Sequence, residues 1–190
     1  MWDRIYDLAS QAPAGSDGLM LVPYLRGANG PLWDPRARGV LVGMTTDHTR
    51  ASLLRAIFEG LAFESRSILE RMELGTGAPI CSIRSYGGAS QNAAWNQIFA
   101  DVLGRSVAVG RESNPVALGA AISAGYGVGI YPSPVEAASS MIHLDTCFEP
   151  DSELSDFYAE LYQRVYIHLY PPLQTLMSTL SQIIAEGHRN

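Results

Sequence analysis

The strongest constraint on the fold is an alternation of strand-forming and helix-forming segments in the middle of the chain. Residues 80–86 have the pattern of a strand, and two glycines separate them from a helical pattern at residues 92–103. A second short strand is expected at residues 106–109, before a helix that opens at Asn114-Pro115. Strands that alternate with helices predict an α/β domain with a sheet that is at least partly parallel.

The first part of the chain predicts two more strands and the longest helix. Residues 19–25 and 39–43 have strand patterns, and the segment between them is a loop rich in Gly, Pro and Asn. Apolar residues then recur at helical spacing from the capping residues 46–49 to about Leu74. Gly75 is expected to supply the left-handed residue that ends this helix.

Two features inside this long helix carry structural predictions. Gly60 interrupts it at a cost of about 1 kcal/mol, which indicates that another backbone packs closely there. Arg55 and Glu59 stand one turn apart, and we expect them to pair on the solvent side of the helix.

The C-terminal part of the chain is predicted to be helical. A helix is expected to begin at Ser133-Pro134, because proline is favoured one residue inside a cap. Apolar residues in the last segment recur every three or four positions: Phe157, Leu161, Val165, Leu169, Leu173, Leu176, Leu180 and Ile183. Pro171-Pro172 must kink or divide this helix, because neither proline has a backbone N–H to donate.

Composition excludes several classes of function. The net charge of −6 and a pI near 5.1 argue against a nucleic-acid partner. All 13 basic residues are arginine, so mechanisms that need a lysine amine are excluded. No apolar run is long enough for a membrane span, and we expect a cytoplasmic protein. Cys81 and Cys147 have no metal-ligand spacing and are expected to be buried thiols.

The segment from Ser85 to Gln97 is the best candidate for a ligand site. Gly87 and Gly88 end a predicted strand and lead directly into a capped helix. Glycines allow a ligand to approach the main chain, and a helix N-terminus offers free N–H groups and partial positive charge. Asn92 stands where its amide can bond a nucleobase edge or a ribose. The same glycines also suit an ordinary strand-to-helix turn, so the pattern by itself leaves both interpretations open.

Three sequence blocks resemble the FGGY family of carbohydrate kinases, in its C-terminal, ATP-binding domain. They are residues 39–63, which begin Gly-Val-Leu-Val-Gly-Met and end Arg-Ala-Ile-Phe-Glu-Gly-Leu-Ala-Phe; the Gly-Gly-Ala-Ser-Gln-Asn block at 87–92; and Ala-Leu-Gly-Ala-Ala at 117–121. The likeness extends over nearly the whole chain and includes Val22-Pro23-Tyr24-Leu25 and Trp33-Asp34-Pro35.

The resemblance implies an actin-like ATPase domain of ribonuclease-H-like topology. Its members transfer the γ-phosphate of ATP, with Mg²⁺, to a sugar hydroxyl, here of a pentulose such as xylulose or a related sugar. The chain would form one domain, with strands and a loop in residues 1–45, an α/β nucleotide-binding core in 46–131 and C-terminal helices in 132–190. Carried over residue by residue, the nucleotide contacts are Gly87, Gly88, Ala89, Ser90 and Asn92.

The resemblance also implies what other parts of such kinases supply. The catalytic aspartate, the sugar-binding residues and the phosphate loops with their opening strands belong to preceding sequence in this family. We therefore expect no catalytic residue and no metal ligand in this chain, and no sugar phosphorylation by the chain alone. Without those opening strands one edge of the sheet would be unpaired, and we expect copies of the chain to associate through it. The small-residue helix from Val116 is expected to pack very closely against a neighbour behind the adenine.

Two other functions compete with that of a kinase part. A non-catalytic nucleotide-binding or association module would keep the same fold without the chemistry. A dinucleotide-binding domain is disfavoured, because Gly119, Gly125, Gly127 and Gly129 do not follow the end of a strand. Asp34 and Asp47 lie in loops, where turn formation and helix capping explain them more simply than catalysis.

Overall fold

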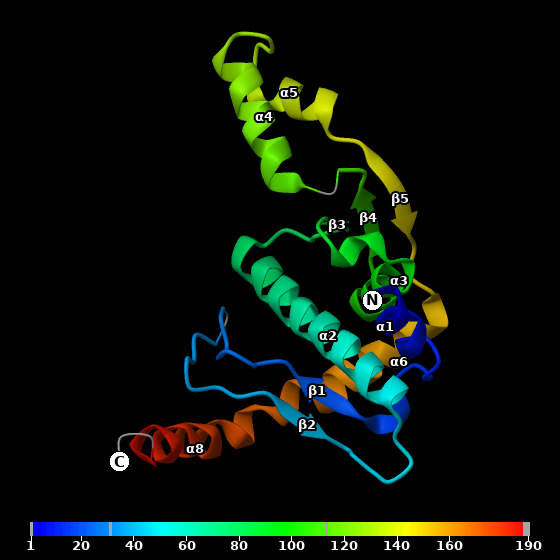
Figure 1. Cartoon of the computed structure of the whole chain (residues 1–190), viewed down its shortest axis with the longest axis vertical. Coiled ribbons are helices and arrows are strands. Elements are labelled where there is room, and N and C mark those ends of the chain that lie inside the picture. Colours follow the sequence, from blue (N-terminus) through cyan, green and yellow to red (C-terminus); the bar gives the residue numbers. More distant parts are fainter. Residues whose placement is uncertain (1, 31, 113, 188–190) are drawn as a thin grey trace.

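The computed structural model describes residues 2–30, 32–112 and 114–187. Figure 1 shows two short sheets joined by the long helix α2, with α4 and α5 projecting at one end and α8 at the other. In chain order the elements are α1 (Trp2–Ala9), η1 (Ser16–Gly18), β1 (Met20–Val22), β2 (Val40–Val42), α2 (Arg50–Thr76), β3 (Ser82–Ser85), η2 (Ala89–Gln91), α3 (Ala93–Leu103), β4 (Ser106–Gly110), α4 (Pro115–Gly127), α5 (Pro134–Met141), β5 (Leu144–Phe148), α6 (Ser152–Leu161), η3 (Tyr162–Tyr166), α7 (Ile167–Leu169), η4 (Pro171–Leu173) and α8 (Gln174–Gly187).

The central sheet confirms the predicted α/β order. Strand β3 pairs in parallel with β4, with Ser82 opposite Ser106, and α3 forms the crossover between them. β5 pairs antiparallel with β4 and was not expected, because its residues Leu144-Asp-Thr-Cys-Phe are almost all exposed and give no apolar pattern. β1 and β2 form a separate antiparallel pair, so the strands predicted on either side of the loop do pair.

Helix α2 begins as predicted but ends later. Thr49 and Ser52 form a reciprocal capping box at its start. The left-handed residue after its end is Gly77, with φ 68°, and its N–H donates to the carbonyl of Glu73. Gly75 lies inside the helix, so its predicted role as the terminating residue is wrong.

Close packing at Gly60 is confirmed. A Cβ atom at this position would overlap the carbonyl oxygen of Leu21 in β1. The helix therefore accepts a glycine in its middle because the backbone of β1 crosses it there.

The main core lies where α1, α2, α3 and α6 meet. Trp95 packs on it, stacked on Phe99 at 4.6 Å between ring centroids and edge-on to Phe58 at 5.2 Å. Cys81 and Cys147, in contrast, are exposed, so their predicted burial is wrong. No helix in the described ranges is long and apolar enough to cross a membrane.

The most deeply buried side chains of the C-terminal segment are tyrosines, while Leu161 and Leu169 of the predicted apolar series are partly buried against the core. Tyr158, Tyr162, Tyr166 and Tyr170 are all almost completely buried, whereas Phe157 and Val165 are exposed. Each buried hydroxyl donates to a carboxylate elsewhere in the fold: that of Glu59, Glu70, Glu64 and Asp34 in that order. Burying a phenol costs little free energy when its hydroxyl has such an acceptor. The face of the segment that carries Tyr158, Tyr162, Tyr166 and Tyr170, here called the tyrosine face, therefore packs against the core.

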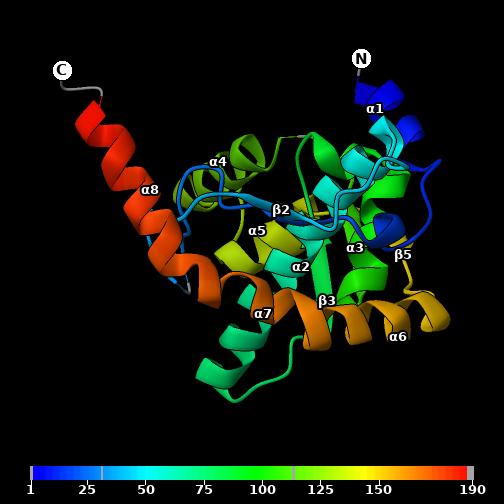
Figure 2. The same ribbon diagram turned by 90° about the horizontal axis from the view of Figure 1, so that it is seen from below.

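A π-helical turn keeps these four tyrosines on one face. Residues spaced by four overshoot an α-helical turn by about 40°. The wider turn η3 lies between the second and third tyrosines and offsets this drift. Pro171 and Pro172 then form the short helix η4, which divides the segment as predicted, and Figure 2 shows α8 continuing away from the body.

Helix α4 does not pack as expected. Its small residues were predicted to lie very close to a neighbour, but within the described residues α4 packs mainly on α5, and only Gly125 of α4 is buried. Val116 is 81% exposed, and a Cβ at Gly119 would meet no atom within 4 Å. The expectation is therefore wrong for the described structure.

Glu59 is the polar centre of the core and not a solvent-side residue. Its carboxylate accepts hydrogen bonds from the Arg55 guanidinium at 2.8 Å, the Tyr158 hydroxyl at 2.6 Å and the Ser16 hydroxyl at 2.9 Å. The backbone N–H of Gly15 adds a fourth at 3.0 Å. The predicted Arg55–Glu59 pair therefore exists, but it is buried and joins α2 to α6 and to the loop before β1.

Glu59→Gln should destabilise the fold by roughly 3 kcal/mol, because it leaves the Arg55 charge without its counter-ion and directs an amide at other donors. Urea unfolding followed by circular dichroism measures this change. Glu160→Gln, on an exposed face of α6, is the control and should change stability by less than about 0.5 kcal/mol. Equal stability of the two variants would show that the buried carboxylate does not hold these segments together.

Candidate nucleotide site

The two glycines after β3 differ in conformation. Gly87 has φ 96°, a value that side-chain-bearing residues rarely adopt. Gly88 has φ −63° and ψ −41°, which any residue adopts. A Cβ added to either would meet no atom within 4 Å, so open space lies beside both. The turn itself therefore requires a glycine only at Gly87, and the geometry of the chain does not explain Gly88.

Asn92 caps helix α3 and keeps part of its hydrogen-bonding capacity. Its Oδ1 accepts from the backbone N–H of Trp95 at 3.2 Å, so the side-chain oxygen serves the helix. Among the described residues its Nδ2 makes no hydrogen bond. The backbone N–H groups of Ala93 and Ala94, in the first turn, have no intrahelical acceptor. These donors are what the site offers a ligand.

Ser90 supports the turn from below. It is 2% exposed, and its hydroxyl donates to the carbonyl of Gly87 at 2.8 Å. Its side chain is therefore engaged inside the protein and does not lie on the open side of the glycines. Ala89 begins the short helix η2 that carries Ser90 under the turn.

Asn96 is a residue of this turn that the sequence did not reveal. Its Nδ2 donates to the carbonyls of Ser90 at 2.7 Å and Asn92 at 2.9 Å, and the side chain is buried. Asn96 thus fixes the turn to the first turn of α3. The only sequence signal was a polar residue four positions after the cap, on the buried face of an otherwise apolar helix.

A second strand end lies beside the first. Strand β4, parallel to β3, ends at Gly110, where a Cβ would overlap the ring of Tyr86. Helix α4 follows with Asn114 as its cap, which accepts from the N–H of Ala117 at 3.0 Å. The carboxyl ends of parallel strands lie on one side of a sheet, which is where ligands bind in α/β domains. Two asparagine-capped helices therefore begin on the side of the sheet that bears the glycine turn.

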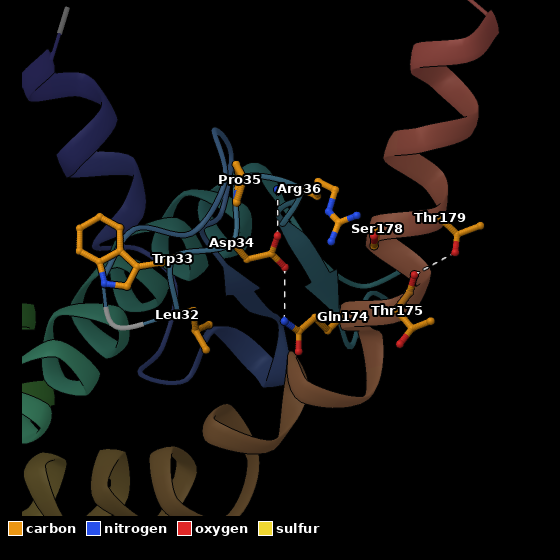
Figure 3. Close-up of a pocket in the computed structure, with 9 residues that line it drawn as sticks. All are labelled: Leu32, Trp33, Asp34, Pro35, Arg36, Gln174, Thr175, Ser178 and Thr179. Atoms are coloured by element: carbon orange, nitrogen blue, oxygen red, sulfur yellow. Dashed lines mark hydrogen bonds between the residues drawn. The ribbon is translucent and has the colours of Figure 1, made fainter.

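Asp34 lies in a different pocket, far along the chain from the glycine turn. Its Oδ1 accepts from the N–H of Arg36 at 2.9 Å, and its Oδ2 accepts from the amide of Gln174 (Figure 3). The hydroxyl of Tyr170 also donates to Oδ2. The hydrogen bond from Arg36 is the main cause that lowers the pKa of Asp34. This carboxylate ties a turn to the tyrosine face, as expected of a turn residue. Asp47 is exposed, and the cap of α2 is Thr49 instead.

The pocket in Figure 3 is a shallow space of about 640 Å³ between this loop and the first turns of α8. Trp33 lies at its edge, exposed and with φ 49°, a strained value for a bulky residue. Asp34 has both oxygens engaged, and the other polar lining groups are hydroxyls, one amide and Arg36. The described residues that line it include no pair of groups suited to acid and base catalysis.

The chain matches the model of the FGGY family of carbohydrate kinases, C-terminal domain, over residues 3–128. It is 31% identical over 182 residues to a xylulose kinase of Staphylococcus epidermidis, covering 96% of this chain and 36% of that protein. It is 40% identical over 148 residues to a glycerol kinase of Dechloromonas aromatica, covering 78% of this chain and 29% of that protein.

Solved structures show the same likeness. Ligand-bound xylulose kinase from Lactobacillus acidophilus superposes with a TM-score of 0.84 at 25% identity, over 94% of this chain and 36% of that one. Glycerol kinase from Plasmodium falciparum with ADP gives a TM-score of 0.72 at 26% identity, over 88% of this chain and 34% of that one. This chain therefore spans about a third of the length of the relatives it matches.

Alanine substitutions should separate the two glycines. Gly87→Ala should destabilise the fold by roughly 1–2 kcal/mol, because its backbone conformation disfavours a Cβ. Gly88→Ala should leave stability unchanged or raise it by up to about 1 kcal/mol, because its conformation is helical and the space beside it is open. Urea unfolding of both variants measures the difference, and a larger loss at Gly88 than at Gly87 would contradict the described turn.

Proposed function

We propose that this chain, which belongs to the FGGY family of carbohydrate kinases, binds ATP and ADP at the glycine turn and supplies the nucleotide-binding part of a sugar kinase. The observation that carries the proposal is Gly88. Its conformation and its open surroundings do not require a glycine. A nucleotide that lies against the main chain would require one, because a side chain would occupy the same space. The glycerol kinase structure with ADP shows that a relative of this fold binds the nucleotide.

The proposed contacts follow from the donors that remain free. The base or ribose lies on the main chain at Gly87, Gly88 and Ala89, and the Nδ2 of Asn92 donates to one of its acceptors. The first turn of α3 adds unpaired N–H groups and the positive end of a helix dipole. Ser90 contributes by holding the turn through its bond to Gly87 rather than by touching the ligand. The nucleotide-binding core is proposed to comprise residues 46–131.

We propose that phosphoryl transfer to the sugar requires residues outside this sequence. Relatives that phosphorylate a sugar or glycerol are about three times as long. Transfer needs a base, a positioned hydroxyl and a metal around the γ-phosphate, and the described pockets do not assemble that set. The substrate class is a polyhydroxy compound, with a pentulose such as xylulose favoured by the xylulose kinases among the relatives.

Mg²⁺ would accompany the nucleotide rather than occupy a site of this chain. Within the described ranges no group of three or more His, Cys, Asp or Glu side chains converges as metal ligands. Mg²⁺ in kinases is held largely by nucleotide phosphates and water, with few protein carboxylates. The described residues therefore do not form a magnesium site by themselves.

Nucleotide binding should depend on Gly88. We expect Mg²⁺-ATP and ADP to bind the whole chain measurably by calorimetry, and Gly88→Val to weaken binding at least about tenfold, because the branched side chain fills the space of the ligand. Gly75→Val is the matched control, since Gly75 also faces open space but lies on α2, outside the candidate site. Equal binding by the two variants would place the nucleotide elsewhere.

Variants of Asn92 divide its two roles in the same experiment. Asn92→Asp keeps the cap oxygen and removes the amide donor, so the fold should persist while ADP binding weakens. Asn92→Ala removes both and should also cost about 1 kcal/mol of stability. If Asn92→Asp binds ADP as well as the unchanged chain, the side chain acts only as a cap.

The chain by itself should release no ADP from ATP when D-xylulose or glycerol is added. A coupled assay for ADP measures this, with a full-length xylulose kinase as the positive control. Turnover that Gly88→Val abolishes would contradict the proposal that further residues are required.

An association module is the second candidate, and the exposed apolar residues of α4, of α5 and of the loop between them favour it. Val116, Val128, Ile130 and Val135 are each at least 70% exposed. This module would form oligomers in light scattering and bind no nucleotide, whereas the kinase part binds ADP whatever its oligomeric state.

A further inference from the structure

A second cavity lies between α2, β1 and the tyrosine face, away from the glycine turn. It has a volume of about 450 Å³, which suits a small organic molecule. Its walls include four buried or nearly buried tyrosine rings, those of Tyr24, Tyr162, Tyr166 and Tyr170. None of its lining residues belongs to the segment from β3 to α4, so this cavity is separate from the candidate nucleotide site.

Glu64 is the central polar group of this cavity. One carboxylate oxygen, Oε2, accepts from the hydroxyls of Tyr24 and Tyr166, each at 3.1 Å. Within the described residues Oε1 accepts no hydrogen bond. Both of its bonded partners are neutral phenols, so nothing in direct contact with Glu64 balances its charge.

Glu64 differs in this respect from its neighbours on α2. Three other glutamates of this helix each have an arginine at 2.8 to 3.1 Å: Glu59 with Arg55, Glu70 with Arg66 and Glu73 with Arg105. In the part of the chain that the structure describes, Glu64 has no basic group within 4 Å. A partly buried carboxylate that lacks a counter-ion is costly, and that cost falls when a cation binds beside it.

Other charged groups around the cavity do not supply the missing cation. Arg71 and His168 line it but are exposed and make no ion pair with Glu64. Glu70 also lines it, but it is already paired with Arg66, and the guanidinium of Arg66 lies 4.8 Å from the centre of the Tyr162 ring. The fold thus already places one cation against a tyrosine face beside a glutamate, next to this cavity.

We propose that this cavity binds a small organic cation of the alkylammonium class, with its charge against Glu64 and its alkyl groups against the tyrosine rings. Aromatic faces and a carboxylate together are the environment that recognises such ions. A neutral ligand would leave the charge of Glu64 unbalanced, and an anion would add to it. The inference does not depend on nucleotide binding, because the two sites share no residue.

Binding should weaken at acidic pH. Burial is the main cause that raises the pKa of Glu64 above its ordinary value, and the two phenol hydrogen bonds only partly oppose it. The cation binds the ionised form, so affinity should be full above this raised pKa and fall as pH drops through it. The other charged side chains that line the cavity are Glu70 and Arg71 on α2 and His168 on α7.

An NMR titration of the whole chain with tetramethylammonium chloride tests the proposal. The methyl protons should shift upfield on binding because they lie over aromatic rings, and the shift should saturate. Glu64→Gln should lower the affinity at least about tenfold. This variant retains an oxygen for the two tyrosine hydroxyls, so it should unfold at the same or a higher temperature than the unchanged chain.

Glu160→Gln on α6 is the matched control for loss of one negative charge and should leave the titration unchanged. A shift that does not saturate, or that is equal in Glu64→Gln and Glu160→Gln, would overturn the proposal. Displacement of tetramethylammonium by equimolar potassium would also overturn it, because the cavity would then select an inorganic ion. Loss of ADP binding in Gly88→Val with retention of tetramethylammonium binding would show that the two proposals stand separately.

Discussion

The buried carboxylate of Glu59 is the contact on which the arrangement of this chain depends. It lies in the middle of α2 and receives donors from two segments that are distant in sequence, the loop before β1 and α6, and from Arg55 one turn earlier on the same helix. A carboxylate with four donors is well satisfied, whereas one with fewer would be a liability in the core. The position of α6 also fixes the three tyrosines that follow Tyr158. The second cavity therefore owes its walls to this same contact.

The elements with local signals could be predicted from sequence. A few neighbouring residues determine each of these features: the β3–α3–β4–α4 order, the caps at Asn92, Asn114 and Ser133, and the break at Pro171. The buried face of the C-terminal segment could not be predicted from sequence. The apolar series and the tyrosine series have the same spacing and differ by one position. The choice between them depends on acceptors that α2 and the Asp34 loop provide from far away.

The candidate site was predicted in part for a similar reason. Its location followed from a strand, two glycines and a helix cap. The sequence does not predict that Gly87 and Gly88 have different backbone conformations. Ser90 and Asn96 are polar residues whose partners are backbone carbonyls of the same turn, so their roles need coordinates. The exposure of α4 was missed because small residues suit close packing, and no local signal tells whether a partner is within reach.

The π-turn at Tyr162–Tyr166 has a consequence for how this segment can change over evolutionary time. Such a turn holds one residue more than an α-helical turn, as a single-residue insertion would. Deleting one residue there would give a regular helix, yet it would rotate everything beyond it by about 100°. Tyr166 and Tyr170 would then leave Glu64 and Asp34, and α8 would point in another direction. The fold therefore constrains the length of this segment more tightly than the identity of its exposed residues, so it should tolerate substitutions here far more readily than insertions or deletions.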